Sequence, residues 1–202
     1  MVLWLKPESL VLASKSGIRR QILVASGIPV EVRPAPIDER SIERDAGPAS
    51  AADVARLLAA AKAKAVGETM LGRLILGADQ TLGFNGRIFS KPADPAAARA
   101  QLGQLRGSAH ELHSAIAVVQ DRDVLFEHVS SAQLTMRAFS DAFLERYLDT
   151  VGPAALQSVG SYQLEAAGIH LFERIDGDHF TILGLPLLPL LRFLRTQGYV
   201  DA

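Results

Sequence analysis

Two residues of opposite charge, Asp79 and Lys91, flank a predicted β-hairpin. The apolar run 74–76 predicts a buried strand that ends at Asp79, and Asn85-Gly86 is typical of a two-residue hairpin turn. The hairpin therefore brings a carboxylate and an ammonium to one place. The carboxylate can hold a cation or take a proton from water, and the ammonium can neutralise phosphate oxygens, which suits a phosphorylated, metal-bound substrate. A surface hairpin with ordinary charges is the alternative.

A second polar group follows the apolar run 10–12. Ser14, Ser16, Arg19 and Arg20 span the start of a predicted helix, where hydroxyl groups, loop amides and guanidinium groups form a physically sound anion cradle. The spacing is not that of a Walker loop. Adjacent arginines point in different directions on a helix, so at most one is expected to reach a given phosphate. A solvent-exposed basic first turn is the alternative.

Two acids and a lysine lie farther along the chain. Asp38 and Glu39 follow a short predicted strand and have the chemistry of a metal ligand or a base, but the local pattern favours a solvated loop. The stretch 41–50 has no periodicity and is expected to be irregular and mobile. Lys62 lies late in a long helix capped by Ser50, where a cation suits the helix dipole, so a structural role is the simpler local interpretation.

The elements around these residues favour an α/β fold. Strands alternate with helices, and hairpins make the sheet mixed rather than all parallel. The runs 111–120 and 124–135 predict a broad antiparallel pair. Helices are expected after Asp94 and after Ser140, and a terminal apolar helix is expected at 185–194.

The stretch 160–165 is small and polar with a single aromatic residue, which suits the lining of a pocket for a flat ring. It ends at Glu165, and a strand is expected at 169–175. His110 and His113 have a spacing that resembles a metal motif. Because residues three apart on a strand face opposite sides, they are not expected to share a metal.

The whole chain sets broad limits. Its 202 residues are 49% hydrophobic and 21% charged, as in a soluble globular protein, and its net charge of −1 implies no attraction to nucleic acid or to an anionic membrane. The absence of cysteine excludes disulfides, thiolate zinc sites and cysteine nucleophiles, so any metal would be a hard cation held by oxygen. No signal peptide or membrane span is expected, and a cytoplasmic location is predicted.

In this order, the motifs resemble the Maf family of nucleoside triphosphate pyrophosphatases over nearly the whole chain. Five groups of residues carry the resemblance: Ser14, Ser16, Arg19 and Arg20; Asp38 and Glu39; Lys62; Gly77-Ala78-Asp79 with Lys91-Pro92; and Gly177-Asp178 with Gly184-Leu185-Pro186-Leu187. The resemblance implies one α/β domain over residues 1–202, with a long mixed sheet flanked by helices and two lobes about a central cleft. It also implies a homodimer that uses Mg²⁺ or Mn²⁺.

The implied reaction cleaves the α–β phosphate bond of a nucleoside triphosphate and yields a monophosphate and pyrophosphate. Asp79 would bind the metal or activate the attacking water, with Glu39 completing an oxygen-only cation site. The triphosphate would be bound by Lys62, Lys91, Arg19 or Arg20, Ser14 and Ser16. An aspartyl-phosphate phosphatase is disfavoured because Asp79-Gln80-Thr81 lacks a second aspartate.

Three features resemble the branch of the family that favours 7-methyl-GTP: Gly17-Ile18 before the arginines, Gln80 after the aspartate and Glu165. A carboxylate at Glu165 can accept both adjacent donors of a guanine edge, whereas uracil or thymine is better met by an amide. Ile18 stands where that branch commonly has a bulky aromatic. The alternatives are a dTTP/UTP pyrophosphatase and a non-catalytic nucleotide-binding regulator of cell division.

Overall fold

A computed structural model describes residues 3–47 and 49–201, and a single mixed sheet runs through it. The strand order is β2-β1-β3-β5-β6-β7, and β4 pairs with the end of β3. Among the strand pairs of these described residues, β1–β2 and β1–β3 are parallel and the others are antiparallel. The strands are β1 (Leu10–Leu12), β2 (Val30–Val32), β3 (Leu74–Phe84), β4 (Arg87–Phe89), β5 (Ala109–Gln120), β6 (Asp123–Met136) and β7 (Phe172–Asp176). The predicted mixed α/β fold is confirmed.

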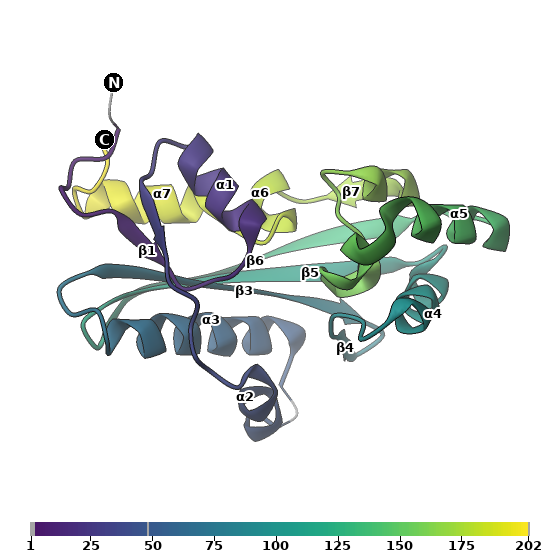
Figure 1. Ribbon diagram of the computed structural model, residues 1–202, viewed down its shortest axis with the longest axis horizontal. Helices are drawn as coiled ribbons and strands as arrows, with labels where there is room; N and C mark the ends of the chain where they lie inside the picture. The colour runs from purple at the N-terminus through teal and green to yellow at the C-terminus, as the bar shows by residue number, and fades with distance from the viewer. Residues whose placement is uncertain (1–2, 48, 202) are drawn as a thin grey trace.

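Helices cover both faces of this sheet. Figure 1 shows α3 along one face, α1 and α7 on the opposite face, and α4 and α5 at the far end. The helices are α1 (Gly17–Ala25), α2 (Glu39–Asp45), α3 (Ala51–Gly67), α4 (Pro95–Leu105), α5 (Asp141–Val151), α6 (His179–Ile182) and α7 (Leu187–Thr196). Three 3₁₀ segments, η1 (Gly152–Leu156), η2 (Val159–Ser161) and η3 (Ala167–Leu171), lie between α5 and β7.

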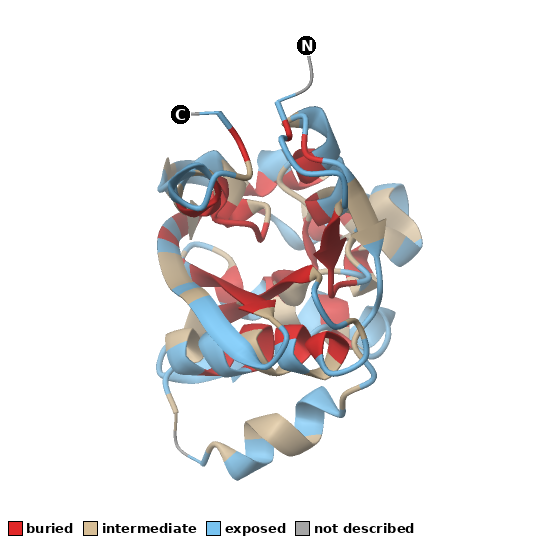
Figure 2. Ribbon diagram, turned by 90° about the vertical axis from the view of Figure 1, so that its left-hand side faces the viewer, coloured by how far each residue is buried: buried red, intermediate tan, exposed pale blue. Residues whose placement is uncertain are grey.

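The buried residues fall into three clusters, and Figure 2 shows them on the faces where helices meet the sheet. Beneath α3 the side chains are small, which lets this helix lie close to β3. A Cβ atom on Gly77 would stand only 2.1 Å from the carbonyl oxygen of Ala59 and 2.8 Å from the amide nitrogen of Ala63. This close approach fixes the distance between α3 and β3 at the centre of the sheet.

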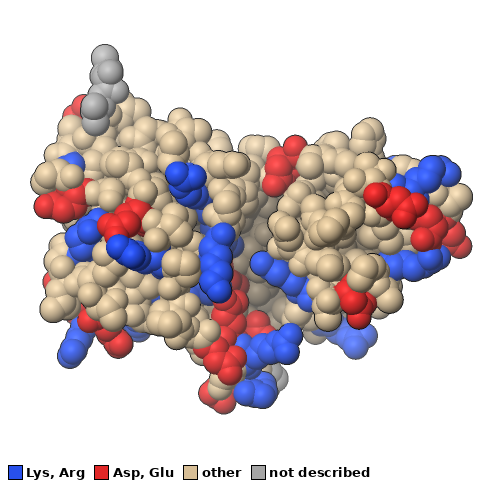
Figure 3. All heavy atoms as spheres, viewed as in Figure 1, with Lys and Arg blue, Asp and Glu red and all other residues tan. Residues whose placement is uncertain are grey.

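The molecule is hollowed on one side. In the view of Figure 3, a groove separates the left and right halves of the surface, and both acidic and basic side chains gather in its lower part. The strands β3 and β5 pass behind it from one half to the other, paired from Leu74↔Gln120 to Gly83↔Glu111. The expected two lobes are thus parts of one sheet.

Several local predictions are confirmed. Ser50, Asp94 and Ser140 each accept a hydrogen bond at the start of a helix, from the amides of Asp53, Ala97 and Phe143 respectively. Asn85 and Gly86 have φ values of 50° and 73°, as a two-residue hairpin turn requires, and join β3 to β4. The long antiparallel pair is β5–β6, and the terminal apolar helix is α7.

Asp79 lies in the middle of β3, so the expectation that a short strand ends at this residue is wrong. The ladder with β5 continues through the polar residues, with Asp79 opposite Ala115 and Gln80 opposite Ser114. Pairing with a strand distant in sequence therefore overrides the local polar signal, which alone resembled a strand end.

The expectation of an irregular segment at 41–50 is also partly wrong, because α2 occupies the first half of this stretch. Asp38 caps this helix by accepting a hydrogen bond from the amide of Ser41 at 3.2 Å. Pro48 lies outside the described residues. The strand expected at 169–175 begins only at Phe172, after η3. Within residues 3–47 and 49–201, no helix combines the length and apolar character needed to cross a bilayer.

Candidate active site

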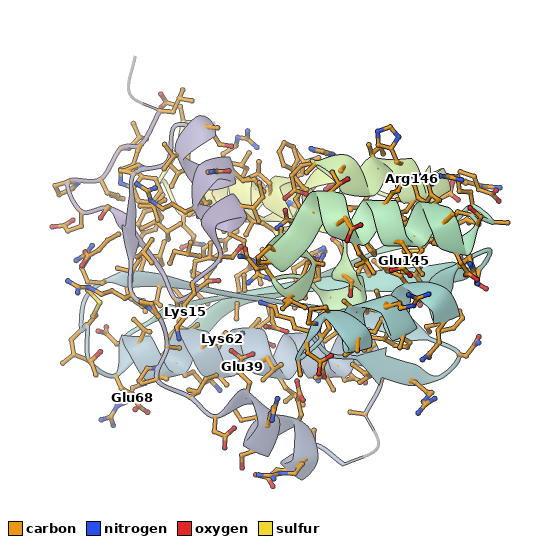
Figure 4. All side chains as sticks on the ribbon, turned by 45° about the vertical axis from the view of Figure 1, so that its right-hand side comes forward. Lys15, Glu39, Lys62, Glu68, Glu145 and Arg146 are labelled. Carbon is orange, nitrogen blue, oxygen red and sulfur yellow. The ribbon has the colours of Figure 1, made fainter. Side chains whose placement is uncertain are left out.

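Lys62 joins two acids from separate parts of the chain. Its Nζ lies 2.5 Å from Oδ1 of Asp79 on β3 and 3.0 Å from Oε1 of Glu39 on α2. Figure 4 shows the Lys62 and Glu39 side chains meeting between α3 and α2. The close packing of α3 at Gly77 helps to place Lys62 against Asp79, because Lys62 lies between the contacting residues Ala59 and Ala63, and Asp79 lies two residues after Gly77. The predicted acid, the predicted helix lysine and one of the paired acids thus form one cluster.

Asp79 and Lys62 are buried, whereas the Glu39 side chain is about half exposed. Burial raises the pKa of Asp79 above its usual value, and the positive charges of Lys62 and Arg19 act in the opposite direction. Desolvation is the larger influence, so the pKa of Asp79 is raised even though two cations lie nearby. Such a group is a candidate for proton transfer.

Arg19 is also buried, and hydrogen bonds to three segments fix its guanidinium. Its Nε donates to the carbonyl oxygen of Gly184 at 2.7 Å, and its Nη1 donates to that of Ala78 at 2.8 Å and to Oγ of Ser14 at 3.1 Å. Burial lowers the pKa of Arg19, and the charges of Asp79 and Glu39 raise it. Of the five N–H groups that a guanidinium carries, the two on Nη2 have no acceptor among the described residues.

The other members of the opening loop have different environments. The Ser16 hydroxyl caps α1 by accepting from the amide of Arg19 at 3.4 Å, and the Ser14 hydroxyl accepts from the amide of Ser16 at 3.2 Å. Arg20 is exposed to solvent. The two arginines therefore point to different places, as their adjacency predicts.

Gln80 is held by the interior of the protein. Its Nε2 lies 3.0 Å from Oγ of Ser114, 2.9 Å from the carbonyl oxygen of Ile182 and 3.3 Å from that of Thr181. The donors of its side-chain amide are thus directed at α6 and β5. A direct contact between Gln80 and a substrate stays a prediction.

Lys91 follows β4 and lies within electrostatic range of the cluster. Partial burial lowers its pKa, as does the positive charge of Arg19, while the charges of Glu39 and Asp79 raise it. Lys91, two residues after the end of β4, is exposed to solvent and close enough to Asp79 for their charges to interact.

Glu43 is a residue that the sequence did not single out. It lies one helical turn after Glu39 on α2 and is half-buried. Burial raises its pKa, and so do the negative charges of Asp79 and Glu39. The signal that would identify it is its four-residue spacing from Glu39, which has meaning only if α2 is known to be a helix.

Glu165 stands apart from this cluster. It is exposed between η2 and η3, and the described residues offer it no hydrogen bond or ion pair. Its neighbours Ser161 and Tyr162 are buried, and the Tyr162 hydroxyl lies 2.7 Å from Nε2 of His110. The stretch 160–165 is therefore partly core, and a role of Glu165 in binding a base stays a prediction.

The carboxylates of Asp79 and Glu39 have the chemistry of ligands for a magnesium-like ion. No group of three or more histidine, cysteine or acidic side chains among residues 3–47 and 49–201 is arranged to hold a metal. Asp79 and Glu39 nevertheless supply two carboxylates that both contact Nζ of Lys62, and magnesium is commonly held by one or two carboxylates together with substrate phosphates. The two histidines of β5 have separate partners, Tyr162 for His110 and Ser131 for His113.

The sequence matches the family model described as Maf-like protein over residues 9–197. The chain belongs to this family. A nucleoside triphosphate pyrophosphatase of Rhodopseudomonas palustris (strain ATCC BAA-98 / CGA009) is 55% identical over 198 residues, which are 98% of each chain. A 7-methyl-GTP pyrophosphatase of Rhizobium meliloti (strain 1021) is 50% identical over 195 residues, which are 96% of this chain and 98% of that one.

Solved structures resemble this Maf-like chain more distantly. A nucleoside-triphosphatase / dITP/XTP pyrophosphatase from Mycobacterium abscessus has 22% identity and a TM-score of 0.37, covering 64% of this chain and 74% of that one. This similarity is too distant to bear on function. The predicted site residues differ in their surroundings: Glu39, Lys62 and Asp79 are in direct contact, and Arg19 bonds Ser14 and the carbonyl of Ala78 next to Asp79. Arg20 and Glu165 are exposed.

Proposed function

We propose that this Maf-like protein is a nucleoside triphosphate pyrophosphatase that hydrolyses the α–β phosphate bond and releases pyrophosphate. The observation that carries the proposal is the line of contacts Glu39–Lys62–Asp79, at 3.0 and 2.5 Å, with the buried Arg19 beside it. A buried acid for the water and several cations for the phosphates are what this hydrolysis needs. The names of the relatives support the same reaction.

Asp79 is the group that takes the proton of the attacking water. Desolvation makes its carboxylate more basic than an exposed one, and the positive charge of Lys62 opposes this rise in the pKa of Asp79. A base whose pKa moves toward the working pH is more effective in proton transfer. No covalent intermediate is needed.

The cations stabilise the negative charge that develops on the departing pyrophosphate. Arg19 offers the two N–H groups of Nη2 in a fixed orientation, because Nε and Nη1 are bonded to the protein. Lys91 approaches from the end of the hairpin, and Lys62 from α3. Donors that are already oriented stabilise a transition state without reorganising during the reaction.

Asp79 and Glu39 are the residues that would hold a magnesium or manganese ion together with phosphate oxygens of the substrate. When bound, such an ion supplies neutralisation of phosphate charge and lowers the pKa of water. Lys62 contacts the same two carboxylates and so keeps them oriented.

The test is the product formed from a nucleoside triphosphate with magnesium. Pyrophosphate and monophosphate are expected, and Asp79→Asn is expected to abolish their release while the protein remains folded by circular dichroism. Asp53→Asn is the matched control, since Asp53 is an exposed acid near the start of α3. Release of orthophosphate would contradict the bond assignment. Tight nucleotide binding without any product would favour the regulatory module instead.

We further propose that the preferred substrate is 7-methyl-GTP. The Rhizobium meliloti relative with this name supports the proposal, as do Gln80 and Glu165, whose carboxylate suits a guanine edge. A panel of canonical and methylated triphosphates should give the highest kcat/KM for the methylated guanine nucleotide. Glu165→Gln should reduce this preference, and faster hydrolysis of dTTP or UTP by the unaltered protein would contradict it.

We also propose that the protein forms a homodimer through the outer edge of β6. Because β7 pairs only with β6 residues from Gln133 onward, positions 123–132 have no strand partner on that side in the described part of the chain. Val124 and Leu125 are exposed there, and such an edge can pair with a second copy. Sedimentation should show a dimer that Leu125→Lys converts to a monomer and that Leu71→Lys, a change at another exposed leucine, leaves intact.

A further inference from the structure

Ser114 is a fully buried hydroxyl in the middle of β5 that the proposed chemistry does not use. It lies opposite Gln80 in the ladder with β3. Its Oγ accepts a hydrogen bond from Nε2 of Gln80 at 3.0 Å and donates one to the carbonyl oxygen of Thr181 at 2.7 Å. One hydroxyl group therefore connects β3, β5 and α6.

The carbonyl groups that Ser114 and Gln80 bind lie at the end of α6. This helix spans only His179–Ile182, and the last carbonyls of a helix have no partner within it. The Thr181 carbonyl receives the hydroxyl of Ser114, and the Ile182 carbonyl receives the amide of Gln80 at 2.9 Å. These side chains thus fix the end of α6 against the sheet.

The connection that leaves α6 holds Arg19. The amide of Gly184 returns to the carbonyl oxygen of Thr181 at 3.0 Å, and the carbonyl oxygen of Gly184 accepts from Nε of Arg19 at 2.7 Å. Gly184 has a φ of +89°, and a Cβ atom there would lie 3.2 Å from Nη2 of Arg19 and 3.6 Å from Oε1 of Gln80. Gly184 therefore helps to set the orientation of the guanidinium, together with Ala78 and Ser14.

We propose that Ser114 is a positioning residue that, together with Gln80, orients the guanidinium of Arg19 toward the substrate through the Thr181 carbonyl and Gly184. Ser114 does not touch the substrate. This role of Ser114 rests on the proposed function, because it assumes that Arg19 binds a phosphate group of the substrate. A substitution of Gln80 then alters the site by moving Gly184 and Arg19. This effect is separate from any contact that Gln80 makes with the base of the substrate.

The test compares Ser114→Ala, which removes both hydrogen bonds, with Ser114→Thr, which keeps the hydroxyl. Gln80→Met removes the side-chain amide while keeping a side chain of similar length. It replaces Ser114→Ala in the test if that variant does not fold. The matched control is Ser130→Ala, because Ser130 lies opposite Ser114 on β6 and its hydroxyl contacts only His128, at 2.9 Å, among the hydrogen bonds of the described side chains.

Two readouts separate positioning from general stability. The first is kcat and KM with a nucleoside triphosphate, where Ser114→Ala and Gln80→Met should lower kcat about tenfold or more, since small misplacements of a catalytic group have effects of this order. The second is the rate of Arg19 modification by phenylglyoxal, followed by peptide mass spectrometry, with the exposed Arg20 as internal reference. Arg19 should react severalfold faster in both variants.

Ser114→Thr should restore both readouts toward those of the unaltered protein, and Ser130→Ala should change neither. The proposal is overturned if Ser114→Ala lowers the melting temperature but leaves kcat and the Arg19 modification rate unchanged, or if Ser130→Ala has equal effects. Should the unaltered protein release no pyrophosphate, the proposed function fails, while the modification rates still decide whether Ser114 positions Arg19.

Discussion

Gly77 lies so close to Ala59 that a single added carbon would stand 2.1 Å from the Ala59 carbonyl oxygen. This contact presses α3 onto β3 within three residues of both Lys62 and Asp79. The charged pair of the candidate site is thus held together by backbone packing as well as by its own attraction.

Gly77→Ala is expected to push α3 away from β3. Overpacking of a core typically costs about 1–3 kcal/mol, and here the opposing atoms belong to backbone that has little room to move. Urea unfolding should show a loss of at least this order, and pyrophosphate release should fall. Gly103→Ala is the control, because an added Cβ at Gly103 on α4 meets no atom within 4 Å. Unchanged stability of Gly77→Ala would contradict the packing argument.

Lys62→Met is expected to leave the Asp79 carboxylate buried without its nearest cation. Removing one partner of a buried ion pair costs roughly 3–5 kcal/mol when the other charge remains. Because burial raises the pKa of Asp79 and Lys62 opposes that rise, the variant should have a still higher pKa at Asp79. The folded state then binds the proton more tightly than the unfolded state, so stability lost at neutral pH should return as the pH falls toward the usual aspartate range.

The predicted recovery of stability at low pH is checked by measuring the unfolding free energy of Lys62→Met and of the unaltered protein at several pH values. Lys64→Met is the matched control, since Lys64 is exposed on the same helix. A difference between Lys62→Met and the unaltered protein that stays constant from neutral to acidic pH would count against the argument.

His110 should make the fold sensitive to acid. Burial lowers its pKa from 6.5 to about 4, so the unfolded chain binds a proton more readily than the folded one between these values. Stability from this group is complete above pH 6.5 and decreases as the pH falls toward 4, by at most roughly 3 kcal/mol. In His110→Gln the loss of unfolding free energy over this window should be smaller, and an identical pH profile for the two proteins would refute this role.

Gly184→Ala should lower activity more than stability. The φ of +89° strains any other residue, and the new Cβ would lie 3.2 Å from Nη2 of Arg19. Gly198→Ala is the matched control because Gly198 has a φ of +67° and open space around its Cβ position. Both variants should lose a similar amount of thermal stability, but only Gly184→Ala should lose kcat. Equal activity of the two variants would show that Gly184 does not control the orientation of the Arg19 guanidinium.

Local signals predicted much of this fold. Ser50, Asp94 and Ser140 identify three helix starts because a short polar side chain caps the free amides of its own first turn. Asn85-Gly86 identifies the hairpin because both residues tolerate positive φ. These interactions involve only neighbours in sequence.

What the sequence could not predict depends on distant partners. Asp79 resembles a strand end until β5, more than thirty residues away, is known to pair through it. The same holds for the Ser114 hydroxyl, whose acceptor at Thr181 is 67 positions farther along the chain. Glu43 joins the site only through a helix that begins at Glu39, and the local pattern there favoured a loop.

The unbroken β3–β5 ladder also limits how the groove can change its width. Ten consecutive residue pairs, from Leu74↔Gln120 to Gly83↔Glu111, cross from one half of the molecule to the other, and Asp79 lies within them. There is no linker at this point for a hinge, so any closure must bend the sheet itself. A continuous ladder of this kind holds Asp79 at a nearly constant position. Any adjustment to different nucleotides is therefore expected in the surrounding loops and helix ends.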